Sequence, residues 1–316
     1  EVKYSIHVLL QFYDLPKCDL FNGSVFGLPL LENEYDEVVD IGQILKKQKE
    51  EDESGDESVN FSRAGDFKYI CRESLNSHVS SKSSKLGLTC YMEFNVKLGW
   101  FVKMENVLLE PRIVLYHNII SEAETEDLKT RSVPWLRRSL VQSLGDDGRR
   151  GYRTSQSAWM SHLKHSVVAK LDKRVEALTR LSAKKPGSNF FNEPFQVLNY
   201  GIGGQYKPHL DSFRQGDHLN NNDMFPHDRI ATFMFYLADV PKGGATVFTK
   251  LGVFVNPIKG SAILWYNSYK NGDVDDRLEH GSCPIIIGSK WVATKWFRHG
   301  SQLSFNYHKC GHRPEE

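Results

Sequence analysis

Two histidines, one aspartate and one lysine in the second half of the chain have types and spacings that suit a metal centre. His209 and Asp211 form a His-x-Asp pair, and His280 follows much later in the sequence. Two imidazoles and one carboxylate can bind one face of iron(II) and leave its remaining coordination positions open. Lys290, shortly after His280, supplies a cation for a dicarboxylate co-substrate. These residues predict an iron(II) site of the kind that non-haem oxygenases use.

The chemistry requires that the four side chains meet. On a strand, His209 and Asp211 would share a face, because alternate residues point the same way. His280 must then come from a distant strand. The formal charges of iron(II), Asp211, a 2-oxoglutarate dianion and Lys290 sum to zero, which suits an uncharged substrate group such as a prolyl ring. The alternative is a chance His-x-Asp pair and a solvated turn lysine.

The second half of the chain predicts a β-rich domain. Short runs rich in β-branched and aromatic residues are separated by glycines, which is typical of a sandwich or a double-sheet jelly roll. The predicted strands there are residues 195–200, 229–237, 246–248, 261–266, 284–287 and 291–297, and an earlier strand covers 111–116. A jelly roll brings distant strands together at its open end, so it can place His280 beside His209.

Two helices are predicted before these strands. Ser121-Glu-Ala-Glu124 is a capping box, so a helix should begin there and end near Arg131. Apolar residues recur at steps of three and four between His165 and Leu181, which predicts an amphipathic helix. We therefore predict an α+β fold with a double-stranded β-helix (jelly roll) core and flanking helices packed on one face.

The N-terminal part of the chain predicts a boundary near residue 60. Val38 to Leu45 could form a short helix, and the run KKQKEEDESGDES that follows is almost free of apolar residues. Such a run is typical of a solvated linker. We expect residues 1–60 to be an N-terminal segment with a charged linker, and residues 61–316 to form the catalytic domain.

Composition excludes some partners. The net charge of the 316 residues is +1, so no bulk field favours nucleic acid or an anionic membrane. No apolar run approaches the ~18 residues of a membrane span. The N-terminus lacks a signal-peptide pattern, although Glu1 could begin a chain whose signal was removed.

The five cysteines give a further indication of compartment. They are Cys18, Cys71, Cys90, Cys283 and Cys310. None forms a CxxC pair, so a structural zinc site is not expected. The spacings of Cys71 with Cys90 and of Cys283 with Cys310 suit disulfide pairing. The alternative is five buried thiols in a cytosolic enzyme.

Two glycosylation sequons point the same way. Asn22-Gly-Ser and Asn60-Phe-Ser are both acceptor sequences, although each alone is weak evidence. Together with the pairable cysteines they favour the secretory pathway.

Six segments resemble a known family. They are PRIVLYHNIISEAE, YRTSQSAW, NYGIGGQYKPHLD, RIATFMFYLADVPKGGATVF, ILWYN and HGSCPIIIGSKWVATKW. From about residue 105 to 312 the chain resembles the catalytic domain of collagen prolyl 4-hydroxylase alpha subunits. The resemblance implies that His209, Asp211 and His280 bind iron and that Lys290 pairs with the distal carboxylate of 2-oxoglutarate. Related lysyl and oxygen-sensing hydroxylases typically have arginine in place of this lysine.

The same resemblance implies further roles. Tyr200 and Thr232 match hydroxyls near the co-substrate, and Arg153, Tyr206 and Trp296 match positions that face the peptide.

Two tryptophans and the cysteines complete the comparison with that family. Trp159 and Trp265 are expected to be core aromatics rather than contacts. The pairs Cys71–Cys90 and Cys283–Cys310 match its paired cysteines in order and approximate spacing, which leaves Cys18 single.

The implied reaction is the hydroxylation of peptidyl proline to 4-hydroxyproline in proline-rich, collagen-like chains. It would use Fe²⁺, 2-oxoglutarate and O₂, with L-ascorbate to rescue oxidised iron. The family's long helical peptide-binding region does not match residues 1–60, so assembly with protein disulfide isomerase stays open. The chain ends without a KDEL-type signal, so a partner would hold it in the endoplasmic reticulum lumen, or it is secreted. The alternatives are a dioxygenase acting on another peptide and a non-catalytic jelly-roll binding module.

Overall fold

The computed structural model describes residues 66–76, 90–139, 152–183, 193–212, 229–298 and 302. Several sequence-based predictions lie outside these ranges. They are the helix at 38–45, the boundary near residue 60 with the segment before it, the sequons at Asn22 and Asn60, and Cys18 and Cys310. The division into residues 1–60 and 61–316 therefore stays a prediction.

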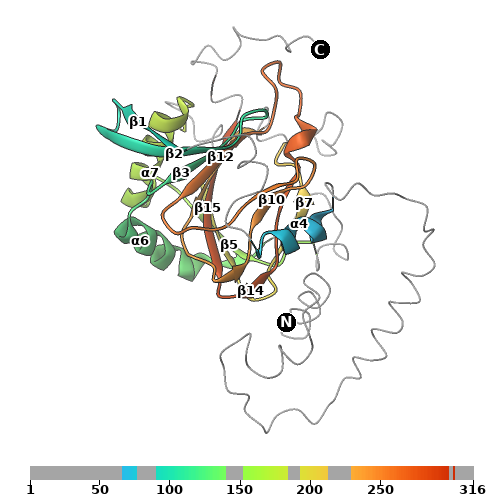
Figure 1. The fold of residues 1–316 in the computed structure, drawn as a ribbon. Helices are drawn as coiled ribbons and strands as arrows, with labels where there is room; N and C mark the ends of the chain where they lie inside the picture. The colour runs from blue at the N-terminus through green and yellow to red at the C-terminus, as the bar shows by residue number, and fades with distance from the viewer. Residues whose placement is uncertain are drawn as a thin grey trace, which may run out of the picture.

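Two facing antiparallel sheets form the core (Figure 1). The nine-stranded sheet has the order β1 (Cys90–Asn95), β2 (Trp100–Leu108), β3 (Ile113–His117), β12 (Ala262–Tyr266), β8 (Arg229–Tyr236), β15 (Lys290–Arg298), β6 (Phe195–Tyr200), β5 (Gln156–Met160) and β4 (Arg137–Arg138). The four-stranded sheet has the order β11 (Val253–Val255), β10 (Thr246–Phe248), β13 (His280–Ser282) and β7 (Tyr206–His209). A third, small sheet pairs β14 (Ile285–Ile287) with β9 (Lys242–Gly243). This arrangement confirms the predicted α+β fold with a jelly-roll core.

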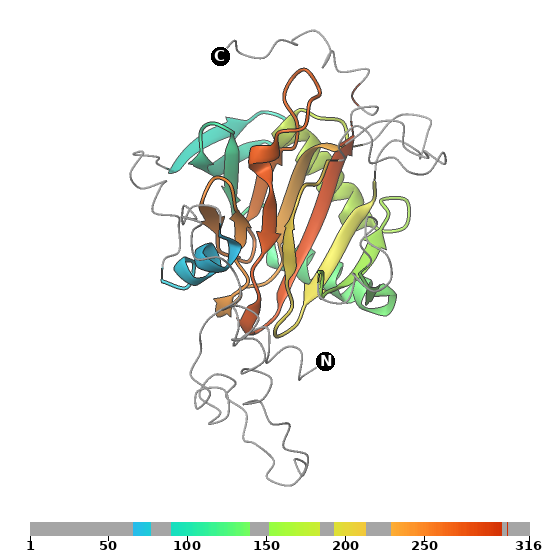
Figure 2. The same ribbon diagram turned by 90° about the vertical axis from the view of Figure 1, so that its right-hand side faces the viewer.

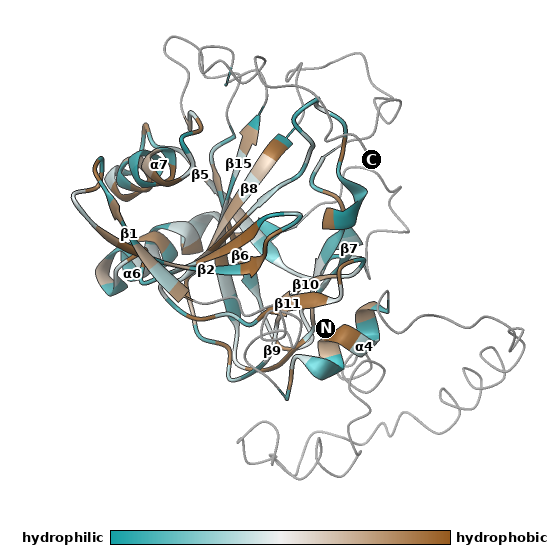
Figure 3. Cartoon of the chain, turned by 45° about the horizontal axis from the view of Figure 1, so that its top comes forward, coloured by the Kyte–Doolittle hydropathy of each residue, from teal (hydrophilic) through white to brown (hydrophobic). Residues whose placement is uncertain are grey.

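The central strands of the large sheet are buried on both faces. In Figure 2, β15 (red) lies between β8 (orange) and β6 (yellow). One face of these strands packs on the small sheet through residues that include Met234, Trp265 and Val292. The other face packs on the helices through residues that include Phe233 and Phe235. Both-sided burial explains why β8 reads as an almost continuous apolar run, which Figure 3 shows in brown.

Two helices cover the outer face of the large sheet. Helix α6 (Glu122–Ser132) begins with the predicted capping box, in which the Ser121 hydroxyl accepts from the Glu124 backbone N–H and the Glu124 carboxylate accepts from that of Ser121. Helix α7 (Ser166–Thr179) buries the apolar stripe that the sequence predicts and ends at Arg180, which has a positive φ of 59°. None of the helices in the described ranges is both long and apolar enough to cross a membrane.

A third helix corrects the prediction that helices pack on one face. Helix α4 (Phe67–Glu73) lies on the outer side of the small sheet, away from α6 and α7 (Figure 1). Its Ile70 and Cys71 pack with Val247 and Phe254. Those strand residues alternate with the inward-facing ones, so the small sheet is also buried on both sides.

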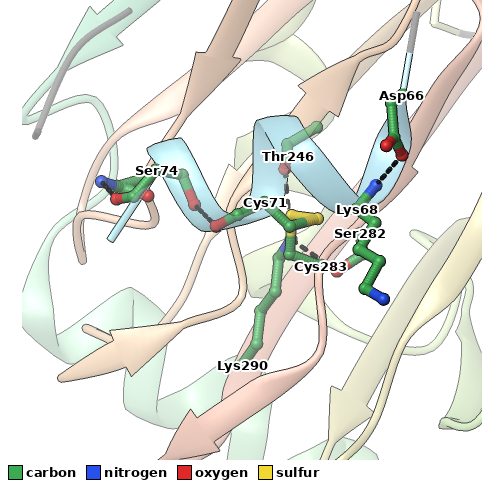
Figure 4. The surroundings of a disulfide bond; sticks show 9 residues. Asp66, Lys68, Cys71, Ser74, Thr246, Ser282, Cys283 and Lys290 are labelled. Atoms are coloured by element: carbon green, nitrogen blue, oxygen red, sulfur yellow. Dashed lines mark hydrogen bonds between the residues drawn. A yellow bond between two sulfur atoms is a disulfide. The ribbon is translucent and has the colours of Figure 1, made fainter. Parts of the chain in front are cut away.

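The cysteine pairing differs from the prediction. Cys71 bonds to Cys283, so the predicted pairs Cys71–Cys90 and Cys283–Cys310 are wrong in this structure, and Cys90 is free and exposed. Sequence spacing favoured the nearer partner because it could not show that α4 packs beside β13 and β14. The disulfide ties α4 to the small sheet next to Ser282 and Lys290 (Figure 4).

Removing this disulfide should destabilise the fold. The bond closes a loop of 212 residues, and native disulfides of this kind typically stabilise by about 2–5 kcal/mol. The single variants Cys71→Ser and Cys283→Ser should therefore lower the urea unfolding midpoint equally. The double variant should lower it no further than either single variant. Cys90→Ser is the matched control. Equal midpoints for all variants, or a larger loss in the double variant, would contradict the pairing.

Candidate metal and co-substrate site

The two candidate imidazole ligands lie opposite each other on neighbouring strands. His280 on β13 is the register partner of His209 on β7, and their ring centroids are 4.5 Å apart. The Asp211 carboxylate completes the group, with Oδ1 3.7 Å from His209 Nε2 and Oδ2 3.6 Å from His280 Nε2. The ligand atoms of all three residues lie within 4.8 Å of one another. The structure thus brings together the three residues that the spacing singled out.

Asp211 is not positioned by strand alternation. Strand β7 ends at His209, and Asp211 lies in the bend that follows. A hydrogen bond from a supported hydroxyl holds its carboxylate instead: Thr232 Oγ1 donates to Asp211 Oδ2 at 2.6 Å, and Asn267 Nδ2 in turn donates to Thr232 Oγ1 at 2.9 Å. The amide of Asn267 directs the Thr232 hydroxyl hydrogen toward the aspartate. The sequence prediction missed Asn267, although it lies inside the matching segment ILWYN.

The protonation states suit metal binding. Both Nδ1 atoms face backbone carbonyls, His209 that of Lys207 and His280 that of Leu278, each at 2.9 Å. Each Nδ1–H can donate there, which leaves each Nε2 as a lone-pair donor aimed at the centre. Burial, with the neighbouring His280, lowers the pKa of His209 to about 3. Burial opposes ionisation of Asp211, but His280 and His209 lower its pKa to about 2. Neutral imidazole and ionised carboxylate together form a donor set that iron(II) accepts.

Lys290 lies in the same cavity at the start of β15. Its side chain is almost fully buried, and its Nζ donates to Ser282 Oγ at 2.9 Å and to Thr246 Oγ1 at 3.1 Å. Among the described residues, no carboxylate lies within ion-pair distance of this amine. Burial alone lowers the pKa of Lys290 to about 7. A buried amine held only by neutral hydroxyls suits an incoming anion, because a charge buried without a counter-ion is costly.

The hydroxyl partners of Lys290 were not predicted. Ser282 and Thr246 are register partners on β13 and β10, and Tyr236 Oη donates to Thr246 Oγ1 at 2.8 Å. A signal for Ser282 was present, since it follows His280 by two residues and therefore shares its face of the strand. The lysine thus spans the gap between the two sheets.

Gly281 separates His280 from Ser282 and has no room for a side chain. A Cβ there would lie 2.8 Å from the ring of Phe67 on α4 and 2.9 Å from the backbone oxygen of Tyr206. Both distances are below normal contact, so the segment requires glycine at this position. The close approach lets α4 pack directly on the strand that carries His280.

The remaining predicted residues surround this centre. Tyr200 pairs with Lys290 across the strands and is buried in the same cavity. Tyr206 stacks on His209 with centroids 3.6 Å apart, and the guanidinium of Arg153 lies 4.5 Å over the Tyr206 ring. Arg153 also donates to Gln196 Oε1 at 3.1 Å. This stack forms one wall of the cavity.

Trp296 on β15 also lines the cavity, and its register partner on β8 is Thr232. Arg229 covers its ring at 3.8 Å, and the Arg229 guanidinium is paired with Glu193. The prediction that Trp159 is a core aromatic is wrong: its side chain is 50% exposed and lies 6.1 Å from Trp296.

The prediction for the second tryptophan is confirmed. Trp265 is buried, and its ring lies 4.7 Å from that of His280. It therefore packs against a candidate metal ligand from inside the core.

Substituting Thr232 tests the support of the aspartate. Thr232→Val removes the hydrogen bond to Asp211 without a large change of volume, and changes of this kind typically lower metal affinity by about 10- to 100-fold. We expect that loss in titrations with Fe²⁺ or Mn²⁺. Thr179→Val is a matched control, because its hydroxyl bonds within α7 on the far face. Unchanged metal affinity in Thr232→Val would contradict the role.

Comparison with known proteins defines the class. Residues 195–298 match the family model of the 2OG-Fe(II) oxygenase superfamily, and they contain all four of the residues first singled out. This part of the chain is therefore similar to 2OG-Fe(II) oxygenase domains. Over 202 residues the chain is 40% identical to prolyl 4-hydroxylase subunit alpha-1 of Homo sapiens, which covers 63% of this chain and 37% of the relative. It is 38% identical over 219 residues to subunit alpha-3 of Bos taurus, covering 68% of this chain and 38% of that one.

The chain spans less than two fifths of the length of these curated relatives. Solved structures with some likeness include the viral collagen prolyl hydroxylase of Paramecium Bursaria Chlorella virus-1 in its 2OG complex. It has 22% identity and a TM-score of 0.45, and the likeness covers 59% of this chain and 95% of that one. A Pseudomonas putida prolyl-4-hydroxylase has 20% identity and a TM-score of 0.40, with 59% of this chain and 91% of that one covered.

Proposed function

We propose that this chain is an iron(II)- and 2-oxoglutarate-dependent enzyme that hydroxylates peptidyl proline to 4-hydroxyproline, in collagen-like, proline-rich chains. One observation carries the proposal: a triad of His209, Asp211 and His280 shares a buried cavity with Lys290, whose amine has no ionised partner among the described residues. The first three suit a ferrous ion, and the fourth suits the far carboxylate of a dicarboxylate.

The residues of the chain then have distinct tasks. His209, Asp211 and His280 hold iron(II), which supplies the oxidative chemistry with 2-oxoglutarate and O₂. Lys290 and the hydroxyls of Thr246 and Ser282 orient the dicarboxylate. The apolar walls keep water from the reacting atoms.

Three residues suit the peptide side of the cavity. Arg153 and Tyr206 form a cation–π pair beside His209, and Trp296, under Arg229, lines the same cavity. Aromatic walls suit a prolyl ring, and a fixed guanidinium suits the peptide carbonyls beside it. Neither the ring nor the carbonyls carry a charge that the site would have to neutralise. The identity with prolyl 4-hydroxylase alpha subunits supports this assignment.

The wider setting follows from the same likeness. L-Ascorbate would restore iron that has become oxidised. The endoplasmic reticulum lumen is the proposed location, and protein disulfide isomerase is a proposed partner. The disulfide between Cys71 and Cys283 supports an oxidising compartment.

The deciding experiment measures product and co-product together. Purified protein with Fe²⁺, 2-oxoglutarate and ascorbate should release succinate only when a (Pro-Pro-Gly) peptide is present, and mass spectrometry should place one added oxygen on proline. Succinate and oxygen addition with other peptides alone would indicate a different peptide substrate. Neither product with any peptide would indicate a binding module.

A further inference from the structure

The hairpin of β1 and β2 carries exposed apolar side chains that the proposed function does not use. Phe94 and Phe101 are register partners, and their rings meet edge to face with centroids 5.3 Å apart. Met92 shares their face of the hairpin, Trp100 lies on the opposite face, and Val96 lies in the turn. Phe101 is 64% exposed and Val96 84% exposed. These five residues form an apolar tip that is exposed on both faces.

The apolar tip has a fixed shape. The backbone N–H groups of Leu98 and Gly99 donate to the carbonyl of Asn95, which closes the turn. Asn95 Nδ2 also donates to the carbonyl of Ala177 on α7 at 3.0 Å, so the hairpin is fastened beside that helix (Figure 1). Single exposed apolar residues are ordinary, whereas a contiguous exposed cluster marks a contact surface. A preformed cluster also loses little conformational freedom on binding.

Basic side chains surround the apolar tip. Two come from the hairpin and two from the adjacent end of α7, and all four are exposed: Lys97, Lys103, Lys173 and Arg180. We refer to these four as the basic rim. Within residues 91–103 and 173–180, Glu93 is the one exposed acidic side chain. The charge around the tip is therefore positive, although the net charge of the whole chain is only +1.

We propose that the apolar tip and the basic rim bind the surface of a membrane that contains anionic lipids. Aromatic rings favour the boundary between headgroups and acyl chains, and lysine and arginine beside them are attracted to anionic headgroups. Because the tip is apolar on both faces and at its turn, a fluid that closes around it covers more of it than a flat protein surface does. A second copy of the chain would bring two positive rims together, which like-charge repulsion opposes. The hairpin would hold the protein on the membrane surface without a spanning segment.

Vesicle binding tests the proposal directly. The full chain should sediment with vesicles of phosphatidylcholine and phosphatidylserine, and far less with phosphatidylcholine alone or at high salt. Phe94→Ser combined with Phe101→Ser should abolish this sedimentation. Lys97→Ala combined with Lys103→Ala should weaken the affinity by about 30-fold, since each basic side chain near an anionic surface contributes about fivefold.

The matched control is Trp135→Ser, at an exposed aromatic residue in the short helix Val133–Trp135, outside the hairpin. This control should bind the vesicles as wild type does. Val96→Asp gives a second test at a turn position that makes no demand on the core, and it should also prevent binding.

Fluorescence locates the contact. Of the six tryptophans, Trp100 is the one on the apolar tip, so brominated lipids should quench its emission. Trp100→Phe should lose most of the quenching and still bind the vesicles.

Three results would overturn the proposal. They are binding that survives both Val96→Asp and the double phenylalanine variant, equal binding to uncharged vesicles, and self-association in the ultracentrifuge that the phenylalanine variant removes. None of these measurements uses turnover, so the membrane contact can fail while the proposed enzymatic function stands, and the reverse.

Discussion

His280→Ala is expected to abolish 2-oxoglutarate turnover linked to proline peptides. The variant leaves His209 and Asp211 as the only members of the triad, and two ligands hold a labile ferrous ion poorly. Changes outside the coordination sphere already lower metal affinity by about 10- to 100-fold, so loss of a direct ligand should cost more. Succinate release and peptide mass spectrometry would measure the loss.

The fold should survive this substitution. The matched control is His162→Ala. This variant removes an imidazole that lies near Asp172, on the helix side of the large sheet rather than in the cavity. That control should keep its turnover, and both variants should keep a wild-type circular dichroism spectrum. Full turnover by a folded His280→Ala protein would refute the iron assignment.

Lys290→Met is expected to raise the 2-oxoglutarate requirement by about 10- to 100-fold, since a hydrogen bond to a charged group contributes about 1.5–3 kcal/mol. The change should be greatest in the dissociation constant of the co-substrate and smaller in turnover at saturation, because the lysine touches the carboxylate far from the reaction. Calorimetric titration and steady-state kinetics would separate the two. Lys242→Met, at an exposed lysine, is the matched control. An unaltered requirement would exclude the proposed role.

The same lysine predicts a pH dependence with a defined sign. Burial lowers its pKa from 10.5 to about 7, so above that pH the amine is largely neutral. Binding of a dianion must then draw a proton onto Lys290, and the affinity should fall as the pH rises above about 7. Calorimetry in buffers of different ionisation enthalpy should detect proton uptake in wild type and none in Lys290→Met.

The stability of the ligand-free protein should change with pH in the opposite direction. The free energy of unfolding should rise between pH 7 and 10.5, because over this range the unfolded chain binds more protons than the folded one.

The strands and the identity of the three side chains that cluster in the cavity could be predicted from sequence because their signals are local. Residues 195–200 form β6 as predicted, since an apolar run between breakers has few alternatives to a buried strand. His209, Asp211 and His280 were found by residue type and order, although the strand that was expected to carry Asp211 ends before it. The support of the aspartate by Asn267 depends on three-dimensional packing that no local pattern encodes.

The predictions that failed concern contacts between segments distant in sequence. Cys71 was paired with the nearer Cys90, and its bond to Cys283 depends on where the short helix α4 packs. Trp159 was assigned to the core because large aromatics are usually buried, yet it lies on the exposed face of β5 near Trp296. Both errors have one cause: burial and pairing are properties of the assembled sheets.

The absent side chain at Gly281 limits how the pocket could be redesigned. The wall that carries His280 cannot move outward, since Phe67 already touches it from behind. A library that aims to admit a bulkier keto acid would have to take its room from the opposite wall, where Leu198, Met234 and Val292 line the same cavity. Shortening those side chains would enlarge the chamber without changing any of the three proposed metal ligands.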